Sequence, residues 1–115
     1  MLRGEIRTVD LDPVRGAEAN KQRPAVIGSK DGANTTASRL GRGVVIVVPV
    51  TTNVSRVYPF QVMLPSEHTG LPHDSKAQAE QVRSIAVERI GRRLGHLPAE
   101  FMTDLDAALR LHLDL

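Results

Sequence analysis

The amino-acid sequence predicts a small, mainly β domain with α structure: a small β-barrel with one helix at its C-terminal end. Two observations support this prediction. Several short segments show the alternation or the β-branched composition of strands, and turn residues separate them. After Pro98, apolar residues recur instead at helical spacing, at Met102, Leu105, Leu109 and Leu113. The 115 residues suffice for a single domain with a modest core, so we expect one domain over residues 1–115.

The first half of the chain contains three of the expected strands. Residues 5–11 alternate polar and apolar, as a half-buried strand does, and the polar stretch 13–22 that follows predicts a loop. Residues 25–29 predict a second strand. Residues 44–51 are nearly all apolar and β-branched, which predicts a central strand. Between these two strands, residues 31–43 predict a long connection with one helical turn.

The second half of the chain has a less regular pattern. Residues 58–64 predict a strand, and the proline near its start places that start at a sheet edge or a bulge. Residues 66–75 predict a loop. Residues 76–85 fit a helix by composition and a strand by the alternation of their second half, which we assign as strand. Residues 87–92 predict a short helix, and residues 93–97 predict a further strand.

The composition excludes several classes of protein. There is no cysteine, which rules out disulfides, thiolate metal sites and cysteine nucleophiles. No window approaches the roughly 18 to 20 apolar residues of a membrane span, and the charged N-terminus is unlike a signal peptide, so we expect a cytoplasmic protein. The histidines match no zinc spacing, so no metal and no cofactor is expected. The few aromatic residues disfavour a base-stacking platform.

Hydrogen-bonding side chains gather where two apolar runs meet loops. Gln22 and Arg23 precede the second expected strand, and Thr51, Thr52 and Asn53 end the central one. A cation and a hydroxyl held on rigid strand ends are what a phosphodiester-binding site needs. We therefore expect these two segments to lie together.

Such groups could cleave RNA without a metal. The 2′-hydroxyl of RNA can attack the adjacent phosphorus, so the enzyme must remove its proton, protonate the leaving oxygen and stabilise a doubly charged phosphorane. Arg23 can stabilise this charge, Thr51 can donate a hydrogen bond to a phosphoryl oxygen, and Glu18 in the polar loop could act as the base. By residue type alone, these three residues could also be a charged residue of a loop and ordinary polar residues at strand ends, without a catalytic role.

Seven short sequence blocks, taken together, resemble the MazF/PemK toxin family. They occur in the order of the family and span essentially the whole chain: residues 4–6, 10–13, 16–18, 22–26, 48–52, 58–60 and 81–85. The form of the connection around residues 40–43 and the leucine-rich C-terminal helix are most similar to the mycobacterial branch of the family.

This resemblance implies an SH3-like barrel of the MazF/PemK and CcdB type that forms a homodimer. It also implies the toxin of a type II toxin–antitoxin system, a sequence-specific mRNA interferase. Such endoribonucleases cleave single-stranded RNA without metal and leave 2′,3′-cyclic phosphate and 5′-hydroxyl ends. The implied partner is a MazE-like antitoxin whose acidic, disordered tail competes with RNA and displaces residues 13–22. The C-terminal helix and residues 44–48 are expected to contribute to the dimer.

The resemblance also assigns roles to residues. Arg23 matches the catalytic arginine of the family and Thr51 its catalytic threonine, while Thr52 is expected to support phosphate binding. Glu18 matches an acidic position whose catalytic role is less settled in the family.

Further residues are expected to bind RNA. Gln22 and Asn53 flank the catalytic pair, and Gln81 and Arg83 fall in a strand that lines the RNA groove, although plain strand surface is an equal alternative for these two. Arg7 departs from the family, which commonly has tryptophan there. It could contact phosphate or stack on a base, so the departure bears on substrate preference.

A second function on the same barrel stays open: a non-catalytic module, or a toxin that poisons a protein, as the gyrase-directed CcdB toxins do. The presence of both Arg23 and Thr51 favours the endoribonuclease, because a module that does not cleave RNA has no need of both.

Overall fold

The computed structural model describes residues 1–11 and 22–115. The predicted loop over residues 13–22 therefore lies outside the described residues, apart from Gln22. The strands are β1 (Glu5–Asp10), β2 (Gln22–Ile27), β3 (Val44–Thr51), β4 (Gln61–Leu64), β5 (Ser75–Gln78), β6 (Arg83–Ala86) and β7 (Ile90–His96). The helices are α1 (Asp31–Leu40), α2 (Ser66–Thr69) and α3 (Ala99–Leu113), with short 3₁₀ turns η1 (Ala79–Gln81) and η2 (Val87–Arg89).

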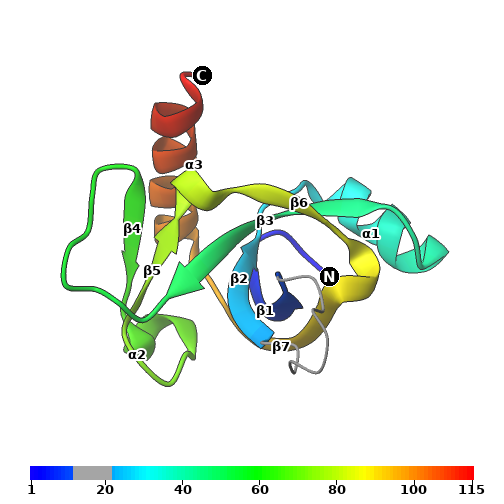
Figure 1. The fold of residues 1–115 in the computed structure, drawn as a ribbon, viewed down its shortest axis with the longest axis horizontal. Helices are drawn as coiled ribbons and strands as arrows, with labels where there is room; N and C mark the ends of the chain where they lie inside the picture. The colour runs from blue at the N-terminus through cyan, green and yellow to red at the C-terminus, as the bar shows by residue number, and fades with distance from the viewer. Residues whose placement is uncertain (12–21) are drawn as a thin grey trace, which may run out of the picture.

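The strands form one antiparallel sheet in the order β4-β5-β3-β2-β1-β7, and β6 pairs with β3 beside it. In the described part of the chain the sheet stays open, with β4 at one edge and β7 at the other. Figure 1 shows β1, β2 and β7 curling around one another on one side of β3, while β4, β5 and α3 lie on the other. The predicted mainly β, barrel-like fold with a C-terminal helix is confirmed.

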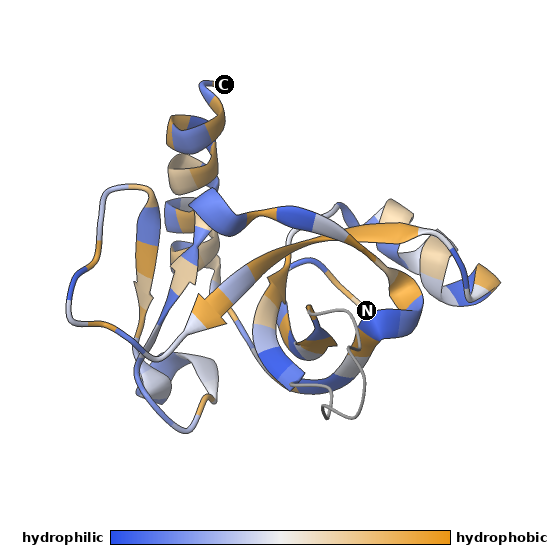
Figure 2. Ribbon diagram, viewed as in Figure 1, coloured by the Kyte–Doolittle hydropathy of each residue, from blue (hydrophilic) through white to orange (hydrophobic). Residues whose placement is uncertain are grey.

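Strand β3 is the centre of the molecule, as predicted, because it pairs with β2, β5 and β6. Its side chains alternate between two hydrophobic cores. Val48 and Val50 belong to the outer core, which is closed by α3, whereas Val45 and Val47 belong to the inner core inside the curled part of the sheet. In Figure 2 this strand is hydrophobic along most of its length, as expected for a strand that contributes side chains to two cores.

Helix α3 packs on the sheet through its first three turns. Pro98 is the N-cap, and Leu105 and Ala108 are buried in the outer core. The predicted apolar stripe is only partly right, because Leu113 is 49% exposed. The C-terminal end of α3 extends past the sheet, so this leucine has no core to enter (Figure 1).

The prediction of a single helical turn within residues 31–43 is wrong, because α1 spans ten residues there. This helix packs through Asn34 and Ala37, neither of which is a large apolar residue. The Asn34 amide donates a hydrogen bond of 2.8 Å to the Ser29 carbonyl, which anchors the first turn. Gly41 ends the helix in the left-handed conformation, with φ 66°. A helix held by a buried amide shows no apolar stripe in its sequence.

The second half of the chain also differs from the prediction in detail. Short helix α2 begins the segment expected to be loop, and β4 starts only at Gln61, after a turn. Residues 76–78 belong to strand β5 rather than to a helix, because both neighbours β3 and β4 pair with this segment. The helix expected over residues 87–92 is reduced to η2, and β7 begins at Ile90. The strand expected in the second half of residues 76–85 is present as β6, and the strand expected to start at a sheet edge is the edge strand β4.

No helix in the described ranges, 1–11 and 22–115, combines the length and the apolar character needed to cross a membrane.

The carboxylate of Glu5, at the start of β1, is held from two sides. It accepts hydrogen bonds of 2.9 Å from the Leu2 backbone N–H and from the Arg7 guanidinium, and its side chain is only 13% exposed. Burial raises the pKa of Glu5, but the Leu2 N–H, the Arg7 hydrogen bond and the Arg7 charge outweigh it and hold the pKa below the ordinary 4.5.

We expect Glu5→Gln to lower the free energy of unfolding by about 1–2 kcal/mol at pH 7. Because the pKa is lowered on folding, this difference should be complete above the unfolded value of 4.5 and disappear as the pH falls through the folded value. Urea unfolding between pH 7 and pH 3 checks this. Glu88→Gln, which removes an exposed carboxylate, is the control. A difference that does not change with pH would contradict the prediction.

Candidate active site

At one end of the inner core, the inward-facing side chains change from apolar to polar. On β2, Ala25 is buried in this core, and Arg23 lies two residues earlier on the same face. On β3 the row that contains Val47 continues to Thr51. On β6, Arg83 pairs with Val47 and lies two residues before the buried Ile85, on the same face. Strand alternation therefore places a hydroxyl and two guanidinium groups at the mouth of the barrel.

A cavity of about 300 Å³ lies at this mouth. It is lined by Leu11, Arg23, Pro49, Val50, Thr51, Gln78, Gln81 and Arg83. The structure thus brings four of the predicted site residues together: Arg23, Thr51, Gln81 and Arg83. Among the described residues, the lining holds two cations and no carboxylate, which suits an anionic ligand.

The two arginines of the cavity are held differently. Arg83 donates a hydrogen bond of 3.1 Å from Nη1 to the carbonyl oxygen of Leu11, which fixes its guanidinium against the end of β1. Arg23 is exposed, and its guanidinium has no hydrogen bond to any residue of the ranges 1–11 and 22–115. One cation is therefore positioned by its own chain, whereas the donors of the other are not used by any of the described residues.

The Thr51 hydroxyl is oriented by the turn that follows β3. Its oxygen accepts a hydrogen bond of 3.2 Å from the Asn53 backbone N–H, so its proton stays available for an acceptor in the cavity. The Asn53 side chain is used within the same turn, where Oδ1 accepts hydrogen bonds from Ser55 N (3.3 Å) and Ser55 Oγ (2.8 Å). Thr52 is exposed and is not part of the cavity lining.

The remaining candidate residues lie elsewhere. Gln22 is exposed at the start of β2, beside the cavity rather than in its lining. Arg7 forms an ion pair of 2.9 Å with Glu5 and donates a hydrogen bond of 3.0 Å to the Gly91 carbonyl. It lines a separate hollow of about 340 Å³ near α1 and η2. Glu18 lies outside the described residues.

Sequence reasoning missed Gln78, which lines the cavity from the end of β5. The segment that contains it, residues 76–85, fits a helix by composition and a strand only by the alternation of its second half. Its place beside Thr51 depends on the pairing of β5 with β3, which a single sequence does not reveal.

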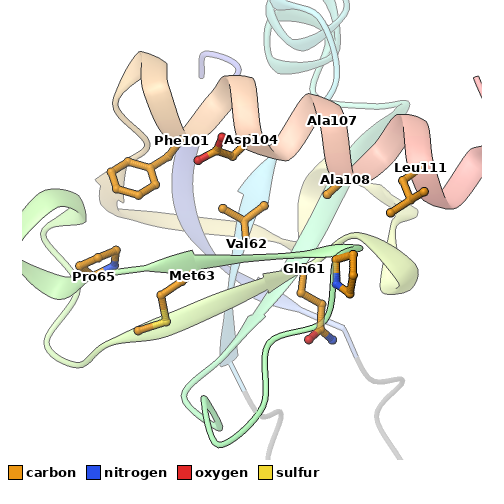
Figure 3. Close-up of a pocket in the computed structure, with 10 residues that line it drawn as sticks. Gln61, Val62, Met63, Pro65, Phe101, Asp104, Ala107, Ala108 and Leu111 are labelled. Atoms are coloured by element: carbon orange, nitrogen blue, oxygen red, sulfur yellow. The ribbon is translucent and has the colours of Figure 1, made fainter.

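A further hollow, of about 520 Å³, lies away from this site. It is formed between β4 and α3 by mostly apolar side chains such as Val62, Met63, Phe101 and Leu111 (Figure 3). It contains none of the predicted site residues.

Fold and site together define a small, mainly β, barrel-like domain with a C-terminal helix and a cationic cavity at one end. Residues 2–113 match the family of PemK-like, MazF-like toxins of type II toxin–antitoxin systems. The endoribonuclease MazF9 of Mycobacterium tuberculosis is 64% identical over 115 residues, which cover 100% of this chain and 98% of that protein.

Two solved structures from mycobacteria are similar to the whole chain. The M. tuberculosis toxin MazF-mt6 has a TM-score of 0.76 and 26% identity, over 96% of this chain and 97% of that one. An endoribonuclease solved in complex with its cognate antitoxin has a TM-score of 0.75 and 25% identity, over 100% of this chain and 96% of that one. The chain belongs to the PemK-like, MazF-like toxins of type II toxin–antitoxin systems, an endoribonuclease family, and the predicted resemblance to its mycobacterial members is confirmed.

Proposed function

We propose that this toxin is a sequence-specific, metal-independent endoribonuclease that cleaves single-stranded RNA to 2′,3′-cyclic phosphate and 5′-hydroxyl ends. One observation carries the proposal: Arg23, Thr51 and Arg83 line a single cavity, although they come from three different strands. A module that only bound a protein would not need a hydroxyl beside two cations.

In the proposed reaction, the scissile phosphate occupies the cavity. Thr51 donates its free proton to a non-bridging oxygen, and Arg23 binds the oxygens on which charge develops as the 2′-oxygen attacks phosphorus. Arg83, fixed by Leu11, balances the charge of the RNA backbone. The P–O5′ bond then breaks to leave the 2′,3′-cyclic phosphate, and the departing O5′ takes up a proton from solvent to give the 5′-hydroxyl end. The nucleophile is the 2′-oxygen of the RNA and not water, so no metal-bound hydroxide is required.

We assign the removal of the 2′-hydroxyl proton to Glu18, an acidic residue five positions before Arg23 in the sequence. Gln22, Thr52, Asn53 and Gln81 are proposed to contact the RNA around the phosphate. Arg7 is proposed to reach the RNA only where the substrate extends beyond the cavity, since its guanidinium is bound to Glu5.

The proposed partner is an antitoxin with an acidic, disordered tail, which would bind the cationic cavity in place of RNA. The similar mycobacterial endoribonuclease was solved with its cognate antitoxin, which supports this assignment. As an enzyme that acts on cellular RNA, the toxin would work in the cytoplasm.

We also propose a homodimer. Exposed apolar side chains lie in both regions expected to form its interface. Val44 is 62% and Ile46 38% exposed at the start of β3, while Leu111 is 58% and Leu113 49% exposed on α3. The other valines of residues 44–48 are buried in the cores of their own chain, so only the outward-facing pair is available to a partner.

The test is cleavage of a long RNA by purified, antitoxin-free protein in EDTA, followed by mapping of the new ends. We expect cuts at a short recurring sequence, with 5′-hydroxyl and 2′,3′-cyclic phosphate ends. Intact RNA, or cleavage that stops when EDTA is added, would contradict the proposal.

A further inference from the structure

We propose that Gln78 reads one base next to the scissile phosphate and so helps to set the cleavage sequence of this toxin. The inference rests on the proposed function, because it assigns a further residue to the same cavity. Gln78 is the last residue of β5 and lines the cavity together with Arg23, Thr51 and Arg83.

The sheet register places Gln78 beside the proposed catalytic threonine. Thr51 pairs directly with Lys76, and Gln78 follows two residues later on the same face of β5. Such diagonal neighbours on adjacent antiparallel strands lie about 7–8 Å apart, within reach of a long side chain. A phosphate bound by Thr51 would therefore have the Gln78 amide next to it, at about the distance of a neighbouring base.

Two nearby side chains show why Gln78, rather than its neighbours, is free for this task. Lys76 shares its face but is turned away, because its ammonium donates a hydrogen bond of 2.7 Å to the Arg56 carbonyl. Gln61, which pairs with Gln78 across β4 and β5, has both ends of its amide occupied. Its oxygen accepts from Tyr58 N–H at 3.1 Å, and its nitrogen donates to Glu80 at 2.6 Å.

The amide of Gln78, in contrast, has no hydrogen-bond partner within residues 1–11 and 22–115, although its side chain is half-buried. The buried side-chain atoms of these residues that lack a hydrogen-bond partner belong to Asp10 and Glu80, and the Gln78 amide is not among them. A half-buried donor and acceptor that face a ligand cavity are well placed to bind that ligand.

The chemistry of the cavity lining separates two tasks. Arginine and threonine contacts to phosphate hold the backbone but carry no sequence information. A carboxamide offers a donor and an acceptor in one plane, which matches the paired donor and acceptor on the edge of an unstacked base. Gln78 therefore adds base discrimination to a site in which Arg23, Thr51 and Arg83 contact the phosphate.

The experiment compares cleavage motifs of the wild type, Gln78→Leu and Gln78→Glu on one long RNA, with all 5′-hydroxyl ends mapped. Leucine keeps the size of the side chain but removes its hydrogen bonds. We expect Gln78→Leu to keep cleaving in an Arg23-dependent manner while base discrimination at one position next to the cut falls by about 5- to 150-fold. Gln78→Glu should shift that position towards bases that present an amino group, because a carboxylate only accepts.

Thr35→Leu, an exposed position on α1, is the control for adding a surface leucine and should leave the motif unchanged. Identical motifs for the wild type and both Gln78 variants would overturn the inference. An equal loss of rate at every site, with the motif preserved, would also overturn it, since Gln78 would then only support the cavity. Wild-type protein that yields no 5′-hydroxyl ends would instead refute the proposed function itself.

Discussion

Arg23→Ala is expected to reduce the rate of RNA cleavage by about a thousandfold or more, because the guanidinium binds the phosphate most strongly when its charge rises in the transition state. RNA binding should weaken much less, since Arg83 and Thr51 stay in the cavity. Arg23→Lys should recover only a small part of the rate, because an ammonium cannot make two parallel hydrogen bonds to phosphate. Single-turnover cleavage of a short RNA substrate, with binding measured separately, checks both expectations.

Arg92→Ala provides the matched control for the loss of one positive charge. Arg92 is exposed on β7 and does not line the cavity. Arg92→Ala should lower the rate of cleavage only slightly, because the protein then attracts RNA less strongly. This difference from the wild type should become smaller as the salt concentration is raised. If Arg23→Ala cleaved within about tenfold of the wild type, the proposed role of Arg23 would be wrong.

Gly95→Ala is expected to lower the free energy of unfolding by about 2–4 kcal/mol. Gly95 pairs with Ile6 in the sheet, and a methyl group there would collide with the backbone carbonyl oxygen of Thr69 at the end of α2. Thr69 cannot easily give way, because it is buried and its hydroxyl donates a hydrogen bond of 3.1 Å to the Pro65 carbonyl. The melting temperature should fall by roughly 10 °C or more.

Gly32→Ala is the control for this substitution, because a methyl group at Gly32 in α1 would meet nothing within 4 Å. It should be neutral or raise the free energy of unfolding by about 0.5–1 kcal/mol, since alanine favours the helix. Equal melting temperatures for Gly95→Ala and the wild type would show that α2 can move away from β7 without loss of stability.

Much of this fold is predictable from the sequence, because most of its segments have side-chain patterns that match their surroundings. Residues 44–50 are apolar throughout, and the strand they form is buried over residues 47–50. Helix α1 could not be predicted in full, since its buried positions are Asn34 and Ala37. Strand β5 could not be distinguished from a helix, since Lys76 is polar although it is buried.

The candidate site divides in the same way. Arg23 and Thr51 could be selected from the sequence because each stands where an apolar strand meets a loop. Gln78 could not, because its place in the cavity depends on which strands pair with β3. The sequence also did not predict that Arg7 lies away from the cavity. Its position follows from the ion pair with Glu5 and from the curl of the sheet.

Because β3 lies between the two cores, both halves of the molecule depend on this strand. Thr51 ends a strand whose preceding residues support the inner core with one set of side chains and the outer core with the other. Neither half of the molecule can therefore open by itself without loosening the strand that carries the proposed catalytic hydroxyl. The amide protons of β3 should accordingly exchange with solvent only when the whole domain unfolds, and heat should inactivate the enzyme in the same single transition in which it melts.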